Sequence, residues 1–282
     1  MNGNVIISPG AWLAPAVDWL NMNFRPLFAF IGLVIESTLG GINALLLSMP
    51  PYALVALSVV FALLLANRRI AVLVAAAMGF CYIAGLWQAT VQTVTLVTIS
   101  VVISVAIAFP LGVVASRVRM VEAGLRPLLD VMQTVPPWVY LIPAVIVFSL
   151  GSVPAIIATV IYGVPPMLRL TTLAFKQVPK DLLELGQAIG ATRQAILFKI
   201  ELPAAMPTLL VGLNQCILLS LAMVVLAGLV GAGGLGAEVT RGLTRMEMGV
   251  GLRAGLAIVA VAIVLDRLSR GAILRHRTAK AG

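Results

Sequence analysis

Residues 184–203 read ELGQAIGATRQAILFKIELP and form a charged, polar interruption in a chain that is otherwise strongly apolar. Long apolar segments precede and follow this stretch, so it is predicted to be a loop outside the membrane. It is the longest loop on the side where the basic residues collect. A structured loop at this place in a membrane protein predicts mechanical contact with a partner protein.

The composition of the whole chain is that of an integral membrane protein. Of its 282 residues, 61% are hydrophobic and only 10% are charged, whereas soluble domains carry about 25% charged residues. Three long intervals contain no charged residue at all: 70–116, 131–168 and 202–237. Intervals of this length hold one or two bilayer crossings each, at about 20 residues per helix. The expected fold class is therefore an all-α integral membrane protein.

Seven segments are apolar and long enough to be predicted as spanning helices. They are residues 52–66, 70–87, 92–116, 133–150, 154–175, 206–230 and 250–266. The loops 67–69, 117–130, 169–203 and 267–282 hold most of the 19 Lys and Arg residues. By the positive-inside rule these loops are cytoplasmic, which predicts an outer N-terminus and a cytoplasmic C-terminus.

Residues 26–48 are apolar enough for an eighth span, but polar and small residues share one face of the helix. Glu36 belongs to this face, together with Gly32, Gly40 and Asn43. Because a carboxylate at mid-bilayer costs about 2.5–3.5 kcal/mol on insertion scales, the stretch is interpreted as an amphipathic helix on the outer surface. The alternative is an ordinary span in which Glu36 faces the bundle.

The loop itself is predicted to contain two short helices. Asp181 and Glu184 resemble a helix-starting capping box. Gly190 suits the left-handed stop after a helix, and Thr192 can cap a second helix. Pro203 is expected to close the element before the next span.

Each of these short helices carries an apolar face. The first helix has Leu182, Leu185 and Ile189 on one side, and the second helix carries Ile196, Leu197 and Ile200. An amphipathic helix outside the membrane must bury its apolar face, for example in a groove of a partner.

At this point the chain resembles the integral-membrane permeases of ABC importers. Those permeases have a Glu-Ala-Ala start on a cytoplasmic loop, a glycine six residues after the Glu, and Ile-x-Leu-Pro ten residues after that glycine. This chain has Glu184, Gly190 and then Ile-Glu-Leu-Pro at 200–203, with Leu185-Gly186 in place of Ala-Ala. The resemblance implies that 176–203 is the loop that couples to an ATPase. Its coupling residues would be Glu184, Ala188, Gly190, Ala191, Ile200, Leu202 and Pro203.

Other segments resemble the permeases for glycine betaine, proline betaine and choline. They include DVMQTVP at 130–136, YLIPA at 140–144, PPMLRLT at 165–171 and GAGGLG at 231–236. The resemblance implies a type I importer fold in a bacterial inner membrane, with residues 1–50 as an outer segment and 51–282 as the transmembrane domain. It also implies two permease copies forming a homodimer, two ATPase subunits that bind ATP and magnesium, and a separate extracytoplasmic substrate-binding protein.

A translocation path is expected near polar and aromatic residues of the spans. The candidates are Gln133, Thr134, Pro136, Trp138, Tyr140, Asn214 and Met223. The aromatic rings could contact a quaternary ammonium by cation–π attraction, or could be interfacial anchors. Met223 could equally fill space in the core, and whether Asn214 touches substrate is open.

Several classes of function fit less well. The glycine pattern at 231–236 matches the dinucleotide fingerprint but follows an apolar helix instead of a strand, so it is interpreted as a packing element or a gate contact. No P-loop sequence is present, so ATP must be bound by a partner and no cofactor is expected here. No metal site, no catalytic residues and no nucleic-acid partner are expected either, and the non-protein partner is membrane lipid. The remaining alternatives are a permease for another small solute, such as an amino acid, or a secondary transporter.

Overall fold

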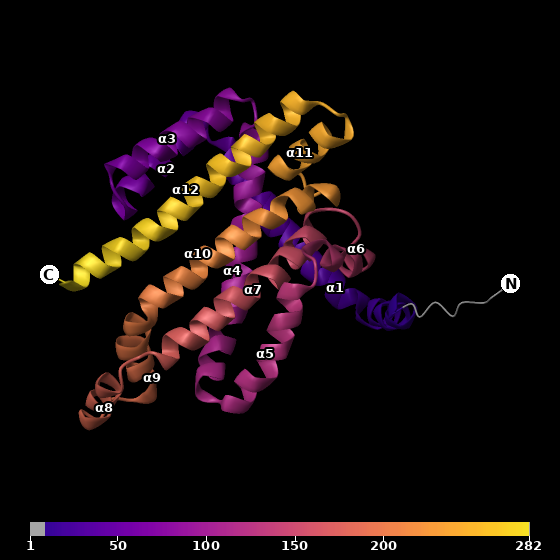
Figure 1. Ribbon diagram of the computed structural model, residues 1–282. Helices are drawn as coiled ribbons and strands as arrows, with labels where there is room; N and C mark the ends of the chain where they lie inside the picture. Colours follow the sequence, from indigo (N-terminus) through magenta and orange to yellow (C-terminus); the bar gives the residue numbers. More distant parts are fainter. Residues whose placement is uncertain (1–8, 282) are drawn as a thin grey trace.

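The computed structural model describes the backbone of residues 9–281 and the side chains of residue 15 and residues 17–271. Within residues 9–281 every regular element is a helix (Figure 1). In chain order the elements are α1 (Pro9–Ser48), α2 (Pro51–Leu65), α3 (Arg68–Ile83), α4 (Trp87–Arg117), α5 (Arg119–Thr134), η1 (Pro137–Tyr140), α6 (Leu141–Phe148), α7 (Ser152–Lys176), α8 (Lys180–Ala188), α9 (Arg193–Ile196), η2 (Leu197–Glu201), α10 (Leu202–Leu229), α11 (Gly234–Thr244) and α12 (Met248–Ala281).

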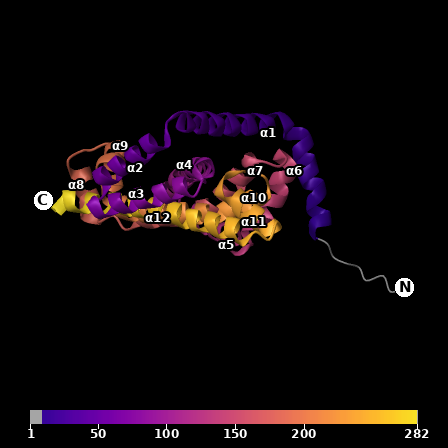
Figure 2. The ribbon, with the colours of Figure 1, turned by 90° about the horizontal axis from the view of Figure 1, so that it is seen from above.

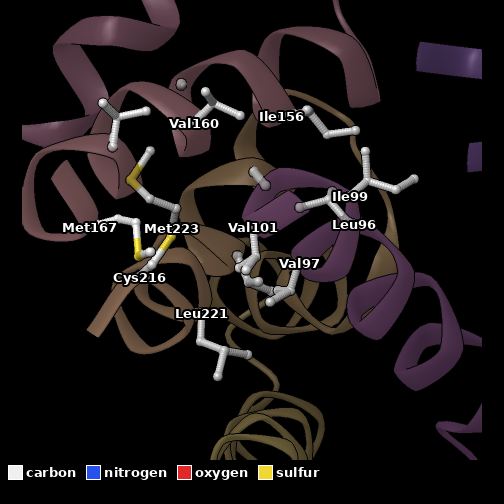
Figure 3. Packing of buried hydrophobic residues seen from close by; sticks show 14 of the residues in the cluster. Leu96, Val97, Ile99, Val101, Ile156, Val160, Met167, Cys216, Leu221 and Met223 are labelled. Atoms are coloured by element: carbon white, nitrogen blue, oxygen red, sulfur yellow. The ribbon is translucent and has the colours of Figure 1, made fainter. Parts of the chain in front are cut away.

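The core lies where α4, α7 and α10 meet. Its buried side chains are mostly aliphatic, as the close view of this contact shows (Figure 3). Buried threonines on these helices donate hydrogen bonds back to the carbonyl four residues earlier, for example Thr95 to Val91 at 2.9 Å and Thr159 to Ala155 at 2.7 Å. This back-bonding satisfies a hydroxyl without a partner helix, so polar residues are tolerated in an apolar bundle.

Helices α4 and α7 approach closely because glycine stands at their contact. A Cβ atom added at Gly112 would lie 2.6 Å from the Cβ of Thr171. Small residues of this kind allow backbones in a membrane bundle to approach each other. A second, smaller core of Ala62, Ala71, Val74 and Val264 joins the α2–α3 hairpin to α12.

The number of helices that can span a membrane differs from the predicted seven. Among the described residues, five helices are long and apolar enough, and six are if the bent pair formed by 119–134 and 137–148 counts as one broken span. α2 has only 15 residues and α3 has 16. At 1.5 Å per residue these helices are shorter than the hydrocarbon core of about 30 Å. The expected single span at 133–150 is also replaced by a bend of 104°.

The segment 26–48 has the length and composition of a span, and its interpretation as a helix on the outer surface stays a prediction. It belongs to α1, in which residues 17–48 are long and apolar enough to span. Its apolar residues Ile31, Ile35 and Leu39 pack against the bundle, and Figure 2 shows α1 running along one side of the other helices. Glu36 is exposed to solvent and lines an open cavity with Gly32 of α1 and with Phe148 and Val153 of the bundle. The helix therefore resembles the alternative span in length, and its carboxylate lies at the cavity between α1 and the bundle.

Candidate coupling loop and translocation path

The first helix of the loop begins differently from the prediction. Pro179 occupies the N-cap position of α8, and no side chain caps the helix. The expected capping box of Asp181 and Glu184 is therefore wrong. Asp181 lies in the first turn instead, where a negative charge interacts favourably with the helix dipole.

The glycine turn after α8 has the predicted geometry. Gly190 has a φ of +70°. Its N–H donates to the carbonyl of Gln187 at 2.9 Å, and the Ala191 N–H donates to the carbonyl of Gly186 at 3.0 Å. These two bonds form a Schellman motif, which ends a helix with a left-handed residue. Thr192 then caps α9, since its Oγ1 accepts from the Ala195 N–H at 3.3 Å.

Gly186 stands where the permease motif has its second alanine, and the structure gives a steric reason for this difference. Gly186 is buried, and a Cβ added there would lie 2.6 Å from Cδ1 of Ile200 and 3.2 Å from Cγ1 of Ile196. α8 therefore packs directly on α9 and η2. The apolar face predicted for the second helix is partly covered inside the loop itself.

Pro203 does not close the loop, contrary to the prediction. Residues 193–229 form one continuous helical stretch, in which 197–201 is a single π-helical turn before the proline. A proline lacks an N–H and its ring collides with the carbonyl four residues earlier, and a π turn is a known way to accommodate such a local defect. The second half of the loop is thus an extension of the spanning helix α10.

An ion pair that sequence reasoning missed ties this extension to α4. Arg117 donates to Oε2 of Glu201 at 2.6 Å, and the Glu201 side chain is only 11% exposed. Arg117 is the last residue of α4, and Glu201 is the last of the π turn. In the sequence, the one indication that Glu201 has a special role was its position inside the Ile-x-Leu-Pro motif.

The outward side of α8 remains uncovered. Leu182 is 39% exposed, Leu185 is 59% exposed and Ile189 is 72% exposed. Glu184, Ala188 and Gly190 are exposed beside them, while Ala191, Ile200, Leu202 and Pro203 are half-buried. The loop therefore presents an apolar face at one end of the bundle, with α11 at the opposite end (Figures 1 and 2).

Five of the predicted path residues gather around the bend between α5 and α6. Thr134, Pro136 and Trp138 are exposed there, and Gln133 is half-buried. Tyr140 is half-buried and donates from its hydroxyl to the carbonyl of Val131 at 3.2 Å. This bond joins the two arms of the bend.

The two remaining path candidates lie elsewhere, between helices. Asn214 is 5% exposed, and its Oδ1 accepts a hydrogen bond from the Ser269 hydroxyl at 2.5 Å, which joins α10 to α12. Met223 is 1% exposed in the α4–α7–α10 core (Figure 3). In this structure both side chains contribute contacts between helices, and their role in transport stays a prediction.

Two of the segments that carry the family resemblance meet in space. Arg169 of α7 donates to Oδ1 of Asp130 of α5 at 2.5 Å. This pair holds the segment 130–136, and with it the bend, against α7.

The glycine-rich segment 231–236 is a packing element. The N–H groups of Gly234 and Leu235 donate to Gln92 Oε1 at 2.9 Å and to Thr93 Oγ1 at 2.8 Å. A Cβ added at Gly236 would lie 1.9 Å from the carbonyl oxygen of Val224. α4 side chains thus cap α11, and the absence of a side chain lets α11 contact the backbone of α10.

Comparison with known proteins agrees with this architecture. Residues 101–270 match the family described as the binding-protein-dependent transport system inner membrane component. The chain belongs to this family. It is a multi-pass protein of the plasma membrane, in agreement with the several apolar helices of the structure.

Similar proteins cover nearly the whole chain. The glycine betaine transport system permease protein OpuAB of Bacillus subtilis is 41% identical over 264 residues, 93% of each chain. The glycine betaine/proline betaine transport system permease protein ProW of Escherichia coli is 39% identical over 272 residues, 94% of this chain and 75% of the relative. Among solved structures, the inward-facing MetNI methionine ABC transporter has a chain with a TM-score of 0.59 at 21% identity, covering 68% of this chain and 95% of that one. This likeness supports the fold.

Proposed function

We propose that this chain is the permease subunit of an ATP-driven importer for a betaine-type osmolyte or related small quaternary amine. The family assignment and the fold support a transport subunit. The names of the two relatives, one for glycine betaine and one for glycine betaine and proline betaine, support the substrate class. Choline, carnitine and trimethylamine N-oxide belong to the same chemical class. A permease for another solute and a secondary transporter are not favoured.

The observation that carries the coupling role is the exposed apolar face of α8. Leu182, Leu185 and Ile189 are exposed on a helix that lies outside the bundle, and such a face is suited to a groove in a partner. The partner is a cytoplasmic ATPase that binds ATP and magnesium, and ATP hydrolysis takes place there. Two ATPase copies, a second permease copy and an extracytoplasmic binding protein complete the proposed assembly.

The structure supports a mechanical route from this face into the membrane. α8 packs on α9 and η2 through Gly186, and these elements continue into α10 without a break. The pair of Arg117 and Glu201 connects the same segment to α4. When the ATPases close, α10 and α4 would move with the loop as rigid elements, in an alternating-access cycle. The residues at the α5–α6 bend are proposed to line the path that opens.

The function is tested by reconstituting the chain with its ATPase and binding protein in vesicles. ATP-dependent uptake of radiolabelled glycine betaine is expected, and choline, carnitine and an amino acid serve as competitors. Vesicles that contain the permease chain alone are the control. If they concentrate glycine betaine without ATP, the chain is a secondary transporter and the proposal is wrong.

A further inference from the structure

Two adjoining cavities lie where α4, α5 and α7 meet. The first has a volume of about 440 Å³ and is lined by Arg117, Arg119, Glu122, Arg126 and Lys176, with small residues between them. The second has a volume of about 390 Å³ and shares Glu122, Arg126 and Lys176 with the first. The second cavity also includes the ion pair of Asp130 and Arg169, and neither cavity includes a residue of α8.

The charges around the first cavity do not balance. Both oxygens of Glu122 are occupied, one by Lys176 at 2.5 Å and the other by Arg126 at 2.8 Å. Arg117 is paired with Glu201. Arg119 is exposed and takes part in no ion pair within the described side chains. Four cations therefore face two carboxylates, and the site carries an excess of positive charge.

The backbone adds to this positive potential. Arg119 is the first residue of α5, and no side chain caps this 16-residue helix. The free N–H groups at a helix N-terminus favour an anion. The ligand chemistry that fits an excess of guanidinium and ammonium groups beside such N–H groups is a phosphate.

The surroundings of the site are apolar. Ile107, Leu111 and Val114 are each between 40% and 46% exposed, and their spacing of four and three places them as an apolar stripe on one face of α4. Val118, which is 44% exposed, forms the extended link between Arg117 at the end of α4 and Arg119 at the start of α5. The second cavity adds Leu125, Leu129, Leu168 and Leu173 beside the shared charged residues.

We propose that these cavities bind the headgroup of an anionic glycerophospholipid, with its phosphate at Arg119 and its acyl chains along the apolar stripe of α4. A soluble phosphate would use the cations but not the stripe, so the combination favours lipid. Basic pockets at the ends of spanning helices are known to bind anionic headgroups. The pair of Arg117 and Glu201 places this site at the same end of the bundle as the coupling loop.

The test is native mass spectrometry of the full-length chain in neutral detergent with equimolar phosphatidylglycerol and phosphatidylcholine. The wild type is expected to retain phosphatidylglycerol in preference. R119Q should lower the retained phosphatidylglycerol about fivefold, as expected for one cation near an anionic lipid. R119K should keep most of it, because it keeps the charge. R69Q, which removes another exposed arginine, is the matched control and should have no effect.

Four results would overturn the proposal. The first is unchanged retention in R119Q, and the second is an equal loss in R69Q. The third is displacement of phosphatidylglycerol by millimolar glycerol 3-phosphate, which would show that the site recognises a soluble anion. The fourth is a loss in R119K as large as in R119Q, which would show that the substitution acts through packing instead of charge.

Discussion

Gly190, after α8, and Gly236, in α11, stand at opposite ends of the bundle and are required for different reasons. At the coupling end, Gly190 has a left-handed φ and nothing within 4 Å of an added Cβ. At the α11 end, a Cβ at Gly236 would lie 1.9 Å from a backbone oxygen of α10. One glycine is required by local conformation and the other by close packing. The comparison teaches that a left-handed turn and a close backbone contact are separate reasons for a glycine. Exposed apolar side chains occur at both ends, for example Ile189 at 72% and Met246 at 93% exposure, and docking of a partner on the α8 face stays a proposal.

The largest effect on stability is expected from disrupting the close contact of Gly236 with α10. G236V places a branched side chain against the α10 backbone, which cannot move away as a flexible side chain could. Overpacking of a core costs about 1–3 kcal/mol and occasionally more, and this position should reach or exceed the upper limit. The melting temperature in detergent measures the loss. The control is G249A, because nothing lies within 4 Å of an added Cβ at Gly249. Equal melting temperatures for G236V and the wild type would contradict the packing role.

The next largest effect is expected on transport, from a substitution on the exposed apolar face of α8. The stability of the chain should not change. L185D places a carboxylate on the exposed face of α8, where burial in a partner groove would leave the charge unpaired. ATP-dependent uptake by the reconstituted assembly should fall at least about tenfold, equivalent to about 1.4 kcal/mol of coupling. The melting temperature of the chain alone should not change.

The matched control for this variant is Q187D, which adds the same charge at another exposed position of α8. Its uptake should stay within about twofold of the wild type. If both variants transport normally, the apolar face of α8 is not the docking surface.

A smaller effect is expected where the coupling loop joins the bundle. E201Q keeps the shape of the side chain but removes the charge that Arg117 contacts. Because Arg117 is half exposed, the expected loss is about 1 kcal/mol, seen as a modest fall in melting temperature. The exchange R117E with E201R should recover part of the loss in a double-mutant cycle. Additive losses in that cycle would show that the two residues do not interact.

The smallest effect on stability is expected at Gly190, where an added Cβ would contact no other atom. G190A must adopt a left-handed conformation, which costs about 1 kcal/mol for a residue with a Cβ, and no atom lies near enough to add a clash. G190N should cost less, since asparagine tolerates this region better. Melting temperatures of the two variants distinguish strain from packing. A loss for G190A as large as that for G236V would remove the difference between the two ends.

The parts of the site that could be predicted depend on neighbours in the chain. The left-handed stop at Gly190 and the cap at Thr192 require only the residue types and the nearest backbone groups. The capping box failed because Pro179 takes the N-cap position, one residue before Lys180. The helix was expected to end at Pro203. It continues instead, because a π-helical turn at 197–201 accommodates the proline.

The missed features involve residues far apart in sequence. The pair of Arg117 and Glu201 joins positions 84 residues apart, and the contacts of Gln92 and Thr93 with the N-terminus of α11 span 142 residues. The bend between α5 and α6 did have a local signal, the adjacent prolines Pro136 and Pro137, but the apolar run around them favoured one straight span. Ion pairs and packing contacts between residues so far apart in the chain cannot be predicted from the sequence until the fold is known.

The amino-acid sequence by itself determined that this protein lies in a membrane, that its basic loops share one side and that a helical loop with an apolar face lies among them. These properties follow from composition, charge placement and short-range backbone chemistry. The tertiary structure alone decided that the loop is continuous with α10, that Glu201 ties it to α4, and that segment 231–236 is a packing element. These outcomes depend on which surfaces meet when the helices assemble, because helix contacts in a bundle are set by fit between distant residues.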